Sequence, residues 1–511
     1  MRKCPLLVLP KGVIGAALDT RVRARNFKEA CMKFSPFILA SAVVLALAMA
    51  SCKPLSSPEV VSQDCTVAAA PANFTRIFIG TPAHPGSQSG ISANDPLDGT
   101  TAQKFDTILR SIAEGERPTW GAQKNIAPEN LIVCIASGTF QTEGQYDTVF
   151  HFGHPTAVHR GFTVEKNWKI HGRGMGHTTL QLASFVPDNF VDSNGSHFVG
   201  GRNVVLETRA ESASGVEVSD LTIDANHDNL SGAAGLPLDL GGIILRSKEG
   251  GHWIHDVKVL GAAGDAGFRS LAYETFAVQI WGNTVDPHVS SGNLIENTTV
   301  TQPGRPVFAD QPPGGEMDGI VFNNAMGEVR NSVVEGYFIA FGGWNIDHVS
   351  IHDNIIRETH YGFNADSWSN NNITLQSNQI IHPHQYGIIM GGGFPGATFA
   401  NWNVVGNVIT LNATNSSGIG IQGEVQNSTF AGNTIQADSA SAHNMSGLWS
   451  FSRTPEAANV NNVFQDNHID KSLAVDFSRD PNFNTNCRNK NRDLQGNVRQ
   501  DFPDNRSSAC R

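Results

Sequence analysis

The sequence lacks the motifs that usually indicate a zinc site, and it is short of basic residues. Its seven Cys include no Cys-x-x-Cys pair, and no His-Glu-x-x-His segment is present. Only 36 Lys and Arg stand against 47 Asp and Glu, a net charge of −11 at pH 7. This balance argues against a nucleic-acid partner, whose phosphates would be repelled. It also disfavours a polyanionic glycan, unless a basic patch or a bridging cation such as Ca²⁺ intervenes.

The apolar stretch near the N-terminus, residues 38–50, is too short to span a bilayer comfortably and is placed like the core of a secretory signal. Residues 48–50 fit ordinary signal peptidase, whereas residues 50–52 resemble a bacterial lipobox ending in Cys52. We favour the second alternative, with lipid attachment at Cys52 as the only membrane contact. The sequence therefore predicts an exported protein, either a cell-envelope lipoprotein or extracellular. Residues 1–52 would form its leader, with Met32 as an alternative start.

Cysteine usage is compatible with export but predicts little cross-linking. Cys487 and Cys510 could form a disulfide in the C-terminal tail. Cys134 lies inside the apolar run 131–135, so we expect an inert thiol in the core.

Five copies of the pattern Asn-x-Ile in the C-terminal half follow one another at similar intervals. Their Ile residues follow one another at steps of 24, 29, 26 and 34 positions: Ile356, Ile380, Ile409, Ile435 and Ile469. A repeat of this size indicates a solenoid, and the period-two alternation of its apolar residues indicates strands rather than helices. We expect three short strands per coil, turned by Asn in the left-handed conformation. The stacked Asn side chains would bond to one another and to the backbone, in a structural role.

This pattern resembles the right-handed parallel β-helix of the pectate-lyase-like superfamily, over roughly residues 95–480. The segment Asp98-Gly99-Thr100-Thr101-Ala102 with Phe105 resembles the entry segment of that group, which implies an amphipathic helix capping the N-terminal end. The expected fold class is all-β, one chain forming a parallel β-helix with an N-terminal cap. Residues 53–94 would be a tether and entry segment, and residues 481–511 a C-terminal tail.

In that superfamily the Gly-apolar strand before each Asn turn lines the substrate groove, which implies a groove on the same strands here. Side chains alternate between the faces of a strand, so stacked coils align outward residues in columns. We predict one column with Trp281, Asn323, Gly342 and Asp366. The neighbouring column is predicted to hold Gln279, Val321, Ala340, Asn364 and Ile389.

We predict a polysaccharide site over Gly342 and Gly343. Aromatic rings beside carboxylates and amides suit a sugar, whose C–H face stacks while its hydroxyls form hydrogen bonds. The predicted substrate-binding residues are Asn323, Trp344, Trp368, Asn364 and His384, and the predicted catalytic residues are Asp318, Asp366, His360 and Tyr361.

Two chemistries remain open for these residues. Asp318 and Asp366 would lie about 10 Å apart if aligned two coils apart, near the upper limit for the carboxyl pair of an inverting glycoside hydrolase. Alternatively, His360 or Tyr361 could abstract a sugar C5 proton as in a lyase. Carboxylates would then bind Ca²⁺, which neutralises the charge of a uronate. The cofactor is left open, with Ca²⁺ as the candidate.

Other family motifs leave further alternatives. The sequence has no Arg-x-Pro-x-x-Arg segment like that of pectate lyases, and no Asn-Thr-Asp, Asp-Asp and Gly-His-Gly series like that of polygalacturonases. Residues 286–288, Asp-Pro-His, resemble a motif of mannuronan C5-epimerases, and residues 317–320 resemble that family's next strand, but Asn323 replaces its second catalytic Asp. We therefore expect a polysaccharide lyase or glycoside hydrolase. A non-catalytic surface solenoid that binds glycan and a uronate C5-epimerase-like enzyme are the alternatives.

Overall fold

The structure is a computed structural model. It describes residues 62–66, 70–82, 89–113, 129–143, 145–151, 154–160, 162–184, 187–191, 197–208, 212–234, 238–264, 275–283, 285–302, 317–365, 369–391, 397–438, 444–451, 459–480 and 486–505. All of them belong to the compact unit Pro58–Arg511.

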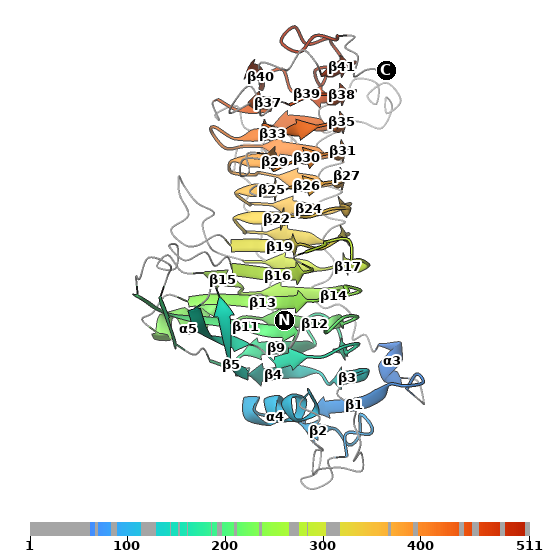
Figure 1. Ribbon diagram of the computed structural model, residues 1–511, viewed down its shortest axis with the longest axis vertical. Helices are drawn as coiled ribbons and strands as arrows, with labels where there is room; N and C mark the ends of the chain where they lie inside the picture. Colours follow the sequence, from blue (N-terminus) through green and yellow to red (C-terminus); the bar gives the residue numbers. More distant parts are fainter. Residues whose placement is uncertain are drawn as a thin grey trace, which may run out of the picture. The chain divides into compact units, whose positions relative to one another are not determined.

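The chain forms a right-handed parallel β-helix, as predicted, in which the strands of successive coils stack on one another (Figure 1). One face is a 15-stranded sheet whose strands pair in the order of the chain. Its main strands are β11 (His197–Thr208), β13 (Leu238–Arg246), β16 (Thr275–Trp281), β19 (Met317–Asn323), β22 (Ile339–Trp344), β25 (Tyr361–Ala365), β29 (Tyr386–Gly391), β33 (Ser417–Gln422), β37 (Ser446–Phe451) and β40 (Ala474–Arg479). We call this sheet the long-strand sheet.

The other faces belong to a 23-stranded sheet, to which most coils contribute two short strands. One row holds β12 (Glu217–Asp224), β14 (Trp253–Leu260), β17 (Asn293–Glu296), β20 (Gly327–Arg330), β23 (Val349–His352), β27 (Thr374–Gln376), β31 (Asn403–Val405), β35 (Thr429–Ala431), β38 (Val463–Gln465) and β41 (Cys487–Asn489). The next row holds β18 (Thr299–Thr301), β21 (Val333–Glu335), β24 (Ile355–Arg357), β28 (Gln379–Ile381), β32 (Val408–Leu411), β36 (Thr434–Ala437) and β39 (His468–Ile469). The predicted Ile repeat is confirmed, because Ile356, Ile380, Ile409, Ile435 and Ile469 are successive partners in this row.

The predicted Asn ladder is present and buried. The Nδ2 group of Asn378 donates to Oδ1 of Asn407 at 3.0 Å and to the carbonyl of Ile351 at 2.9 Å. The same contacts recur from coil to coil, at Asn354, Asn378, Asn407, Asn433 and Asn467. Asn in the left-handed conformation turns the chain at other corners, as predicted, for example at Asn372, Asn401 and Asn427, but none of the five ladder Asn has a positive φ. The residue before each one turns the chain instead, at φ between 52° and 65°: Asp353, Ser377, Gly406, Gly432 and Asp466.

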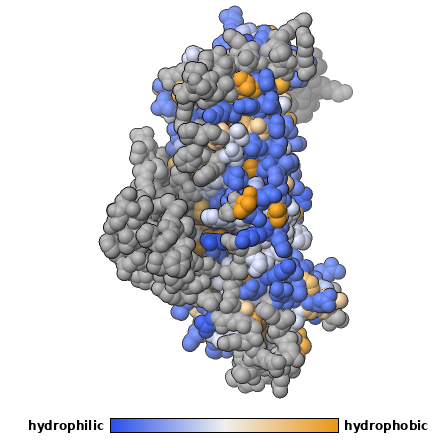
Figure 2. Space-filling model, in the orientation of Figure 1, coloured by the Kyte–Doolittle hydropathy of each residue, from blue (hydrophilic) through white to orange (hydrophobic). Residues whose placement is uncertain are grey.

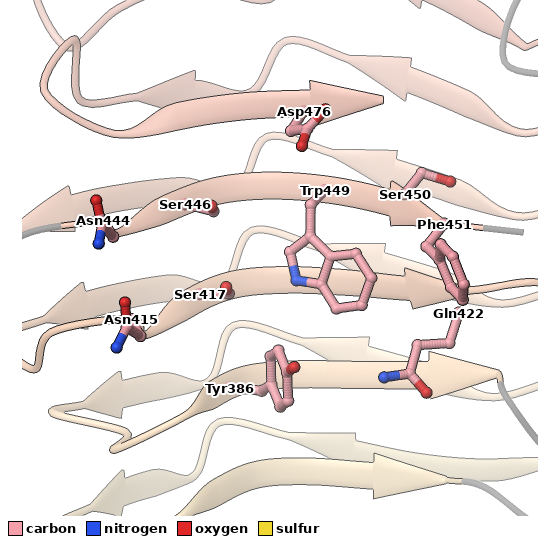
Figure 3. Close-up of a pocket in the computed structure, with 10 residues that line it drawn as sticks. All are labelled: Tyr386, Asn415, Ser417, Gln422, Asn444, Ser446, Trp449, Ser450, Phe451 and Asp476. Carbon is pink, nitrogen blue, oxygen red and sulfur yellow. The ribbon is translucent and has the colours of Figure 1, made fainter. Parts of the chain in front are cut away.

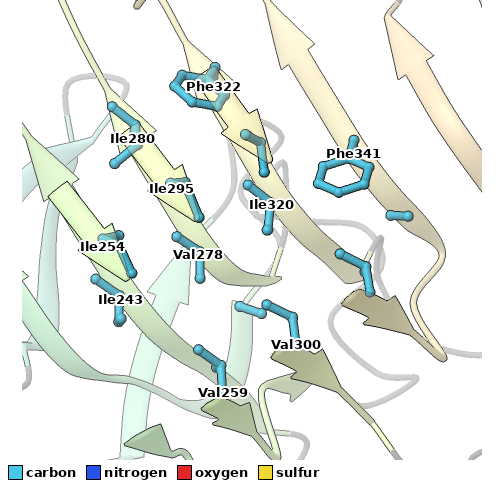
Figure 4. Packing of buried hydrophobic residues seen from close by; sticks show 14 of the residues in the cluster. Ile243, Ile254, Val259, Val278, Ile280, Ile295, Val300, Ile320, Phe322 and Phe341 are labelled. Atoms are coloured by element: carbon cyan, nitrogen blue, oxygen red, sulfur yellow. The ribbon is translucent and has the colours of Figure 1, made fainter. Parts of the chain in front are cut away.

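Aliphatic and aromatic side chains from all faces fill the coil interior (Figure 4). Where the long-strand sheet meets the row of Ile residues, the space is too small for most side chains, and small residues occupy one column. A Cβ on Gly418, for example, would lie 2.6 Å from Cγ2 of Ile435 and 2.5 Å from the carbonyl oxygen of Gly447. This column fixes how consecutive long strands align, because a bulky residue cannot enter it.

The N-terminal end is closed by the predicted helix, α4 (Ala102–Ala113). Its apolar face buries Phe105, Ile108, Leu109 and Ile112 against the first coils, and the hydroxyl of Thr101 accepts a hydrogen bond from the amide of Lys104 as an N-cap. The predicted domain bounds are too narrow for the sheet at both ends. Strand β1 (Thr75–Gly80), in the entry segment, pairs with β3 (Leu131–Ile135), and β41, in the tail, pairs with β38.

The prediction for Cys134 was wrong, because this residue forms a disulfide with Cys65. Cys65 belongs to the short helix α3 (Gln63–Thr66), which packs on the outer face of β3. Alternation along β3 directs Cys134 outward, although it looks like a core position in an uninterrupted apolar run. Cys487 is also disulfide-bonded, while Cys510, the partner predicted for it, lies outside the described residues.

The coloured surface in Figure 2, which belongs to the described residues, is mostly hydrophilic with isolated hydrophobic residues. The exposed large hydrophobic side chains are spread along the chain, from Ile91 and Trp253 to Val498. No helix in the described part of the chain is long and apolar enough to cross a membrane.

Candidate functional site

The outer face of the long-strand sheet presents aligned columns, as predicted, but their register differs at β22. Asn323 pairs with Trp344, and Val321 pairs with Gly342, so both predicted columns shift by two residues here. The cause is the column of small residues: the Cβ position of Gly319 faces the carbonyl of Ala340, so Ala340 takes the small-residue position. The central outward column therefore continues from Gly342 to Asn364, Ile389, Gly420, Trp449 and Asp476.

At the C-terminal coils this column forms an open groove of about 480 Å³, within the range of small-ligand sites. The indole of Trp449 lies over Gly420, whose missing side chain leaves room for the ring; a Cβ there would be 2.8 Å from it. Its ring centre is 5.7 Å from that of Tyr386, with 42° between the planes. The two rings form an aromatic surface in the groove floor, with polar side chains at its ends (Figure 3). The lining residues are Tyr386, Asn415, Ser417, Gln422, Asn444, Ser446, Trp449, Ser450, Phe451 and Asp476.

The groove is rich in neutral hydrogen-bonding groups and poor in charge. Its described lining includes no Lys or Arg, and Asp476 is its one carboxylate. Ser417 and Ser446 are direct partners on adjacent strands, and each is preceded by an exposed Asn two residues earlier, Asn415 or Asn444. The amide and hydroxyl groups thus repeat at one coil spacing, about 4.8 Å. Such an arrangement can bond successive hydroxyls of an uncharged chain.

Aromatic residues extend the surface toward the N-terminal coils. Tyr361 stacks on Tyr386 at 5.5 Å, and His360 stacks on Phe338 at 4.6 Å while meeting Tyr361 edge-on at 4.6 Å. Burial lowers the pKa of His360 to about 4, against an opposing hydrogen bond with Gln385, so its imidazole is neutral at pH 7. Burial likewise lowers the pKa of His384 and raises that of Tyr386.

The structure separates the residues predicted for one site. His360 and Tyr361 lie beside the aromatic surface, and Asn364 is on the central column two coils before Gly420. Asn323 and Trp344 are neighbours at the far end of their strands, where the Trp344 ring meets Phe276 edge-on at 6.0 Å. Asp318 has no exposed surface and lies between Phe276 and Ile339 in register. Asp366 and Trp368 lie outside the described residues.

The groove residues Trp449, Ser417 and Ser446 were missed by the sequence interpretation. A signal for them existed, because the predicted column through Asn364 and Ile389 needed only two further coils to reach Trp449. Gly420 and Trp449 each stand two residues after the small-residue column, as Asn364 does after Gly362. The pairing of a missing side chain with a Trp one coil later predicts a ring lying over the gap.

A separate cluster of charged groups lies on the 23-stranded sheet near α3. Glu217 contacts Lys169 at 3.1 Å and His255 at 3.4 Å, and His255 also contacts Asp256 at 3.0 Å. Burial alone would lower the pKa of His255, but hydrogen bonds to Asp256 and Glu217 raise it to about 9. Burial would raise the pKa of Glu217, yet His255, His171 and Lys169 lower it to about 2. Lys169 also contacts Asp64 of α3 at 2.9 Å, so this cluster fastens α3 to the coils.

Comparison with known proteins gives structural neighbours but no family. No family model and no curated protein sequence matches the chain. Among solved structures, the chain is similar to the A-module of mannuronan C-5 epimerase AlgE6 from Azotobacter vinelandii, with 14% identity over 69% of this chain and 88% of that one and a TM-score of 0.44. It is also similar to an exopolygalacturonase from Thermotoga maritima (10% identity, 74% and 86% covered, TM-score 0.41). A third is the tailspike protein of E. coli bacteriophage HK620 in complex with a pentasaccharide (12% identity, 73% of this chain and 74% of that chain covered, TM-score 0.40).

The first two of these proteins are polysaccharide-acting enzymes, and the third is bound to an oligosaccharide. The strand pairing of the chain itself shows the parallel β-helix fold. That fold serves several activities, so the function has to be argued from the groove.

Proposed function

We propose that this protein is exported and binds a neutral polysaccharide along the outer face of the long-strand sheet, in the groove at Trp449. The observation that carries the proposal is the aromatic surface of Trp449 and Tyr386 between rows of amide and hydroxyl groups. A sugar ring can place its C–H face on the indole while its hydroxyls bond to Ser417, Ser446 and Gln422.

The charge of the groove favours an uncharged ligand. A uronate chain would find no Lys or Arg in the described lining to pair with its carboxylates, on a protein that is already acidic. A neutral glycan meets no such cost. Calorimetric titration should therefore show that the protein binds neutral glucans, galactans or mannans. Uronate oligosaccharides of equal length should bind at least tenfold more weakly. Equal or tighter binding of the uronates would contradict the proposal.

Export is supported by the disulfide between Cys65 and Cys134, because such bonds persist mainly in oxidising compartments. Cys52, the proposed site of lipid attachment, lies outside the described residues. If it is lipidated, Cys52→Ala should move the protein from the membrane fraction to the soluble fraction. Unaltered membrane partitioning of the variant would count against the anchor.

Cleavage of a glycan is a second candidate function: hydrolysis would act on the neutral chain proposed above, whereas a lyase would need a uronate, whose carboxylate acidifies the C5 proton. It is favoured by His360, a neutral imidazole next to Tyr361 at the end of the aromatic surface, where it could accept a proton. Incubation with a panel of polysaccharides separates the possibilities by product. A lyase leaves an unsaturated end that absorbs in the ultraviolet, a hydrolase leaves only new reducing ends, and an epimerase changes configuration without shortening the chain.

His360→Gln should lower such a rate by about 10² to 10⁴ without weakening binding, if His360 transfers the proton. Tight binding with no product on any glycan would instead assign the protein to the non-catalytic solenoids.

A further inference from the structure

Two His and one Asp converge at a corner of the solenoid away from the groove lining. His288 belongs to the segment after β16, and Asp347 and His348 belong to the turn after β22. The imidazole Nε2 of His288 is 3.2 Å from Oδ2 of Asp347, and Nδ1 of His348 is 2.7 Å from its Oδ1. One donor atom from each residue lies within 4.8 Å of the other two, and no other group of three described His, Cys, Asp or Glu residues meets this limit.

This spacing is close to that of ligands around one ion. Bonds of 2.0–2.1 Å in a tetrahedral zinc site place neighbouring donors about 3.3 Å apart. Side-chain rotations alone could bring the three donors to that distance, because both His side chains are about half exposed. The two imidazoles approach opposite oxygens of a single carboxylate, so one ion could replace both His–Asp contacts.

Backbone and neighbouring side chains hold the three residues in place. Oδ1 of Asp286 accepts a hydrogen bond from the amide of His288 at 3.0 Å, and Oδ1 of Asn283 accepts two more from the preceding turn. Nδ2 of Asn372 donates to Oδ1 of Asp347 at 2.6 Å, which orients the carboxylate. Partners of this kind around metal ligands fix their orientation and strengthen metal binding.

We propose that His288, Asp347 and His348 bind one divalent transition-metal ion, with Zn²⁺ as the best fit. Imidazole and carboxylate together suit Zn²⁺, whereas Ca²⁺ takes six to eight oxygen ligands and Mg²⁺ prefers oxygen. The fourth position faces solvent and would hold water. The site escapes sequence motifs because its ligands are 59 residues apart, on coils that only the fold brings together.

The ion would link two coils that are not adjacent. In the long-strand sheet β19 lies between β16 and β22, so the segment with His288 reaches past one intervening coil. A bound ion would therefore fasten the first of these coils to the third.

Calorimetric titration of the full chain without a polyhistidine tag tests the proposal, using Zn²⁺ alone as the probe. We expect one Zn²⁺ per chain, with affinity at least tenfold weaker in His288→Ala and in His348→Asn. Asn is chosen at residue 348 because φ there is +51°, which Asn tolerates. Excess Ca²⁺ should not displace Zn²⁺ from the parent protein.

The matched control is His382→Asn, because φ at residue 382 is +55° and Asn tolerates it. His382 also contacts two carboxylates, those of Glu358 at 3.0 Å and Asp438 at 2.8 Å. These carboxylates approach opposite nitrogens of the His382 ring, so the three groups cannot bind one ion together. Loss of Zn²⁺ binding in the two site variants, with binding kept in the control, supports the site. Binding that is undetectable in the parent, or equal in the parent and His288→Ala, overturns the proposal. Thermal unfolding provides an independent readout, because Zn²⁺ should raise the melting temperature of the parent and of His382→Asn but not of His288→Ala.

Discussion

At the residue scale, the groove depends on one ring and one missing side chain. The Trp449 indole can lie flat on the strand face only because residue 420 is Gly. A sugar stacked on it would remove much of one ring face from water, worth about 1.5–3 kcal/mol. Trp449→Ala should therefore weaken binding of the neutral glycan by roughly 10- to 100-fold, as measured by calorimetry.

Trp253→Ala is the control for this change. Trp253 is also an accessible Trp, but it lies on the 23-stranded sheet, stacked on His255 at 3.9 Å. The control should bind glycan like the parent. If the two variants lose the same affinity, Trp449 is not the platform.

Also at the residue scale, the ion pairs of His255 predict a pH-dependent stability. Its folded pKa, about 9, lies above the ordinary value of 6.5, so its contribution is complete below pH 6.5 and is lost as the pH rises through 9. The free energy of unfolding should fall across this window more steeply in the parent than in His255→Gln, by up to about 1.4 kcal/mol per pH unit.

Urea denaturation from pH 6 to 10 measures this difference. Glu217, whose folded pKa of about 2 lies below its ordinary 4.5, should contribute in the opposite window, losing its effect as the pH falls from 4.5 toward 2. Parallel curves for parent and variant above pH 6.5 would refute the role given to His255.

At the element scale, the Asn ladder holds consecutive coils in register. Oδ1 of Asn407 accepts from both the amide and Nδ2 of Asn378, and its own Nδ2 donates to the carbonyl of Leu375. Removing this side chain leaves buried polar groups without partners. Asn407→Ala should lower the free energy of unfolding by about 2–4 kcal/mol.

Asn403→Ala is the matched control, since Asn403 is exposed on the neighbouring strand β31. It should change stability by less than about 0.5 kcal/mol. Chemical denaturation of both variants tests the difference, and similar stability losses would show that the ladder adds nothing beyond an ordinary surface amide.

The elements also show what could be predicted from the sequence. The Ile repeat gave the coil register because each Ile enters the same core position, which tolerates no charge and no shift. The outward columns were less certain, because outward residues meet no such constraint. The predicted column placed Ala340 beside Val321, and only the space available shows that Ala340 instead takes the small-residue position beside Gly319. The Cys65–Cys134 bond and the His288–Asp347 contact depend on segments outside the repeat, which periodicity cannot place.

At the scale of the whole molecule, a solenoid transmits little between distant coils. Each coil pairs only with its neighbours, so stability is close to a sum of local terms. The N-terminal end, with α3, α4 and the Cys65–Cys134 disulfide, should therefore be energetically independent of the groove at β29–β40. Unfolding can begin at one end while the other remains folded.

This independence predicts the effect of removing the disulfide, which joins residues 69 positions apart. Replacing Cys65 and Cys134 together by Ser should destabilise the N-terminal coils by about 2–4 kcal/mol, because the open chain gains conformational entropy. Hydrogen exchange should show lost protection in β1 and β3, with unchanged protection in β33 and β37 and unchanged glycan affinity. A uniform loss of protection along the chain, or weaker glycan binding, would instead show that the coils unfold as one cooperative unit and that the end cap supports the groove.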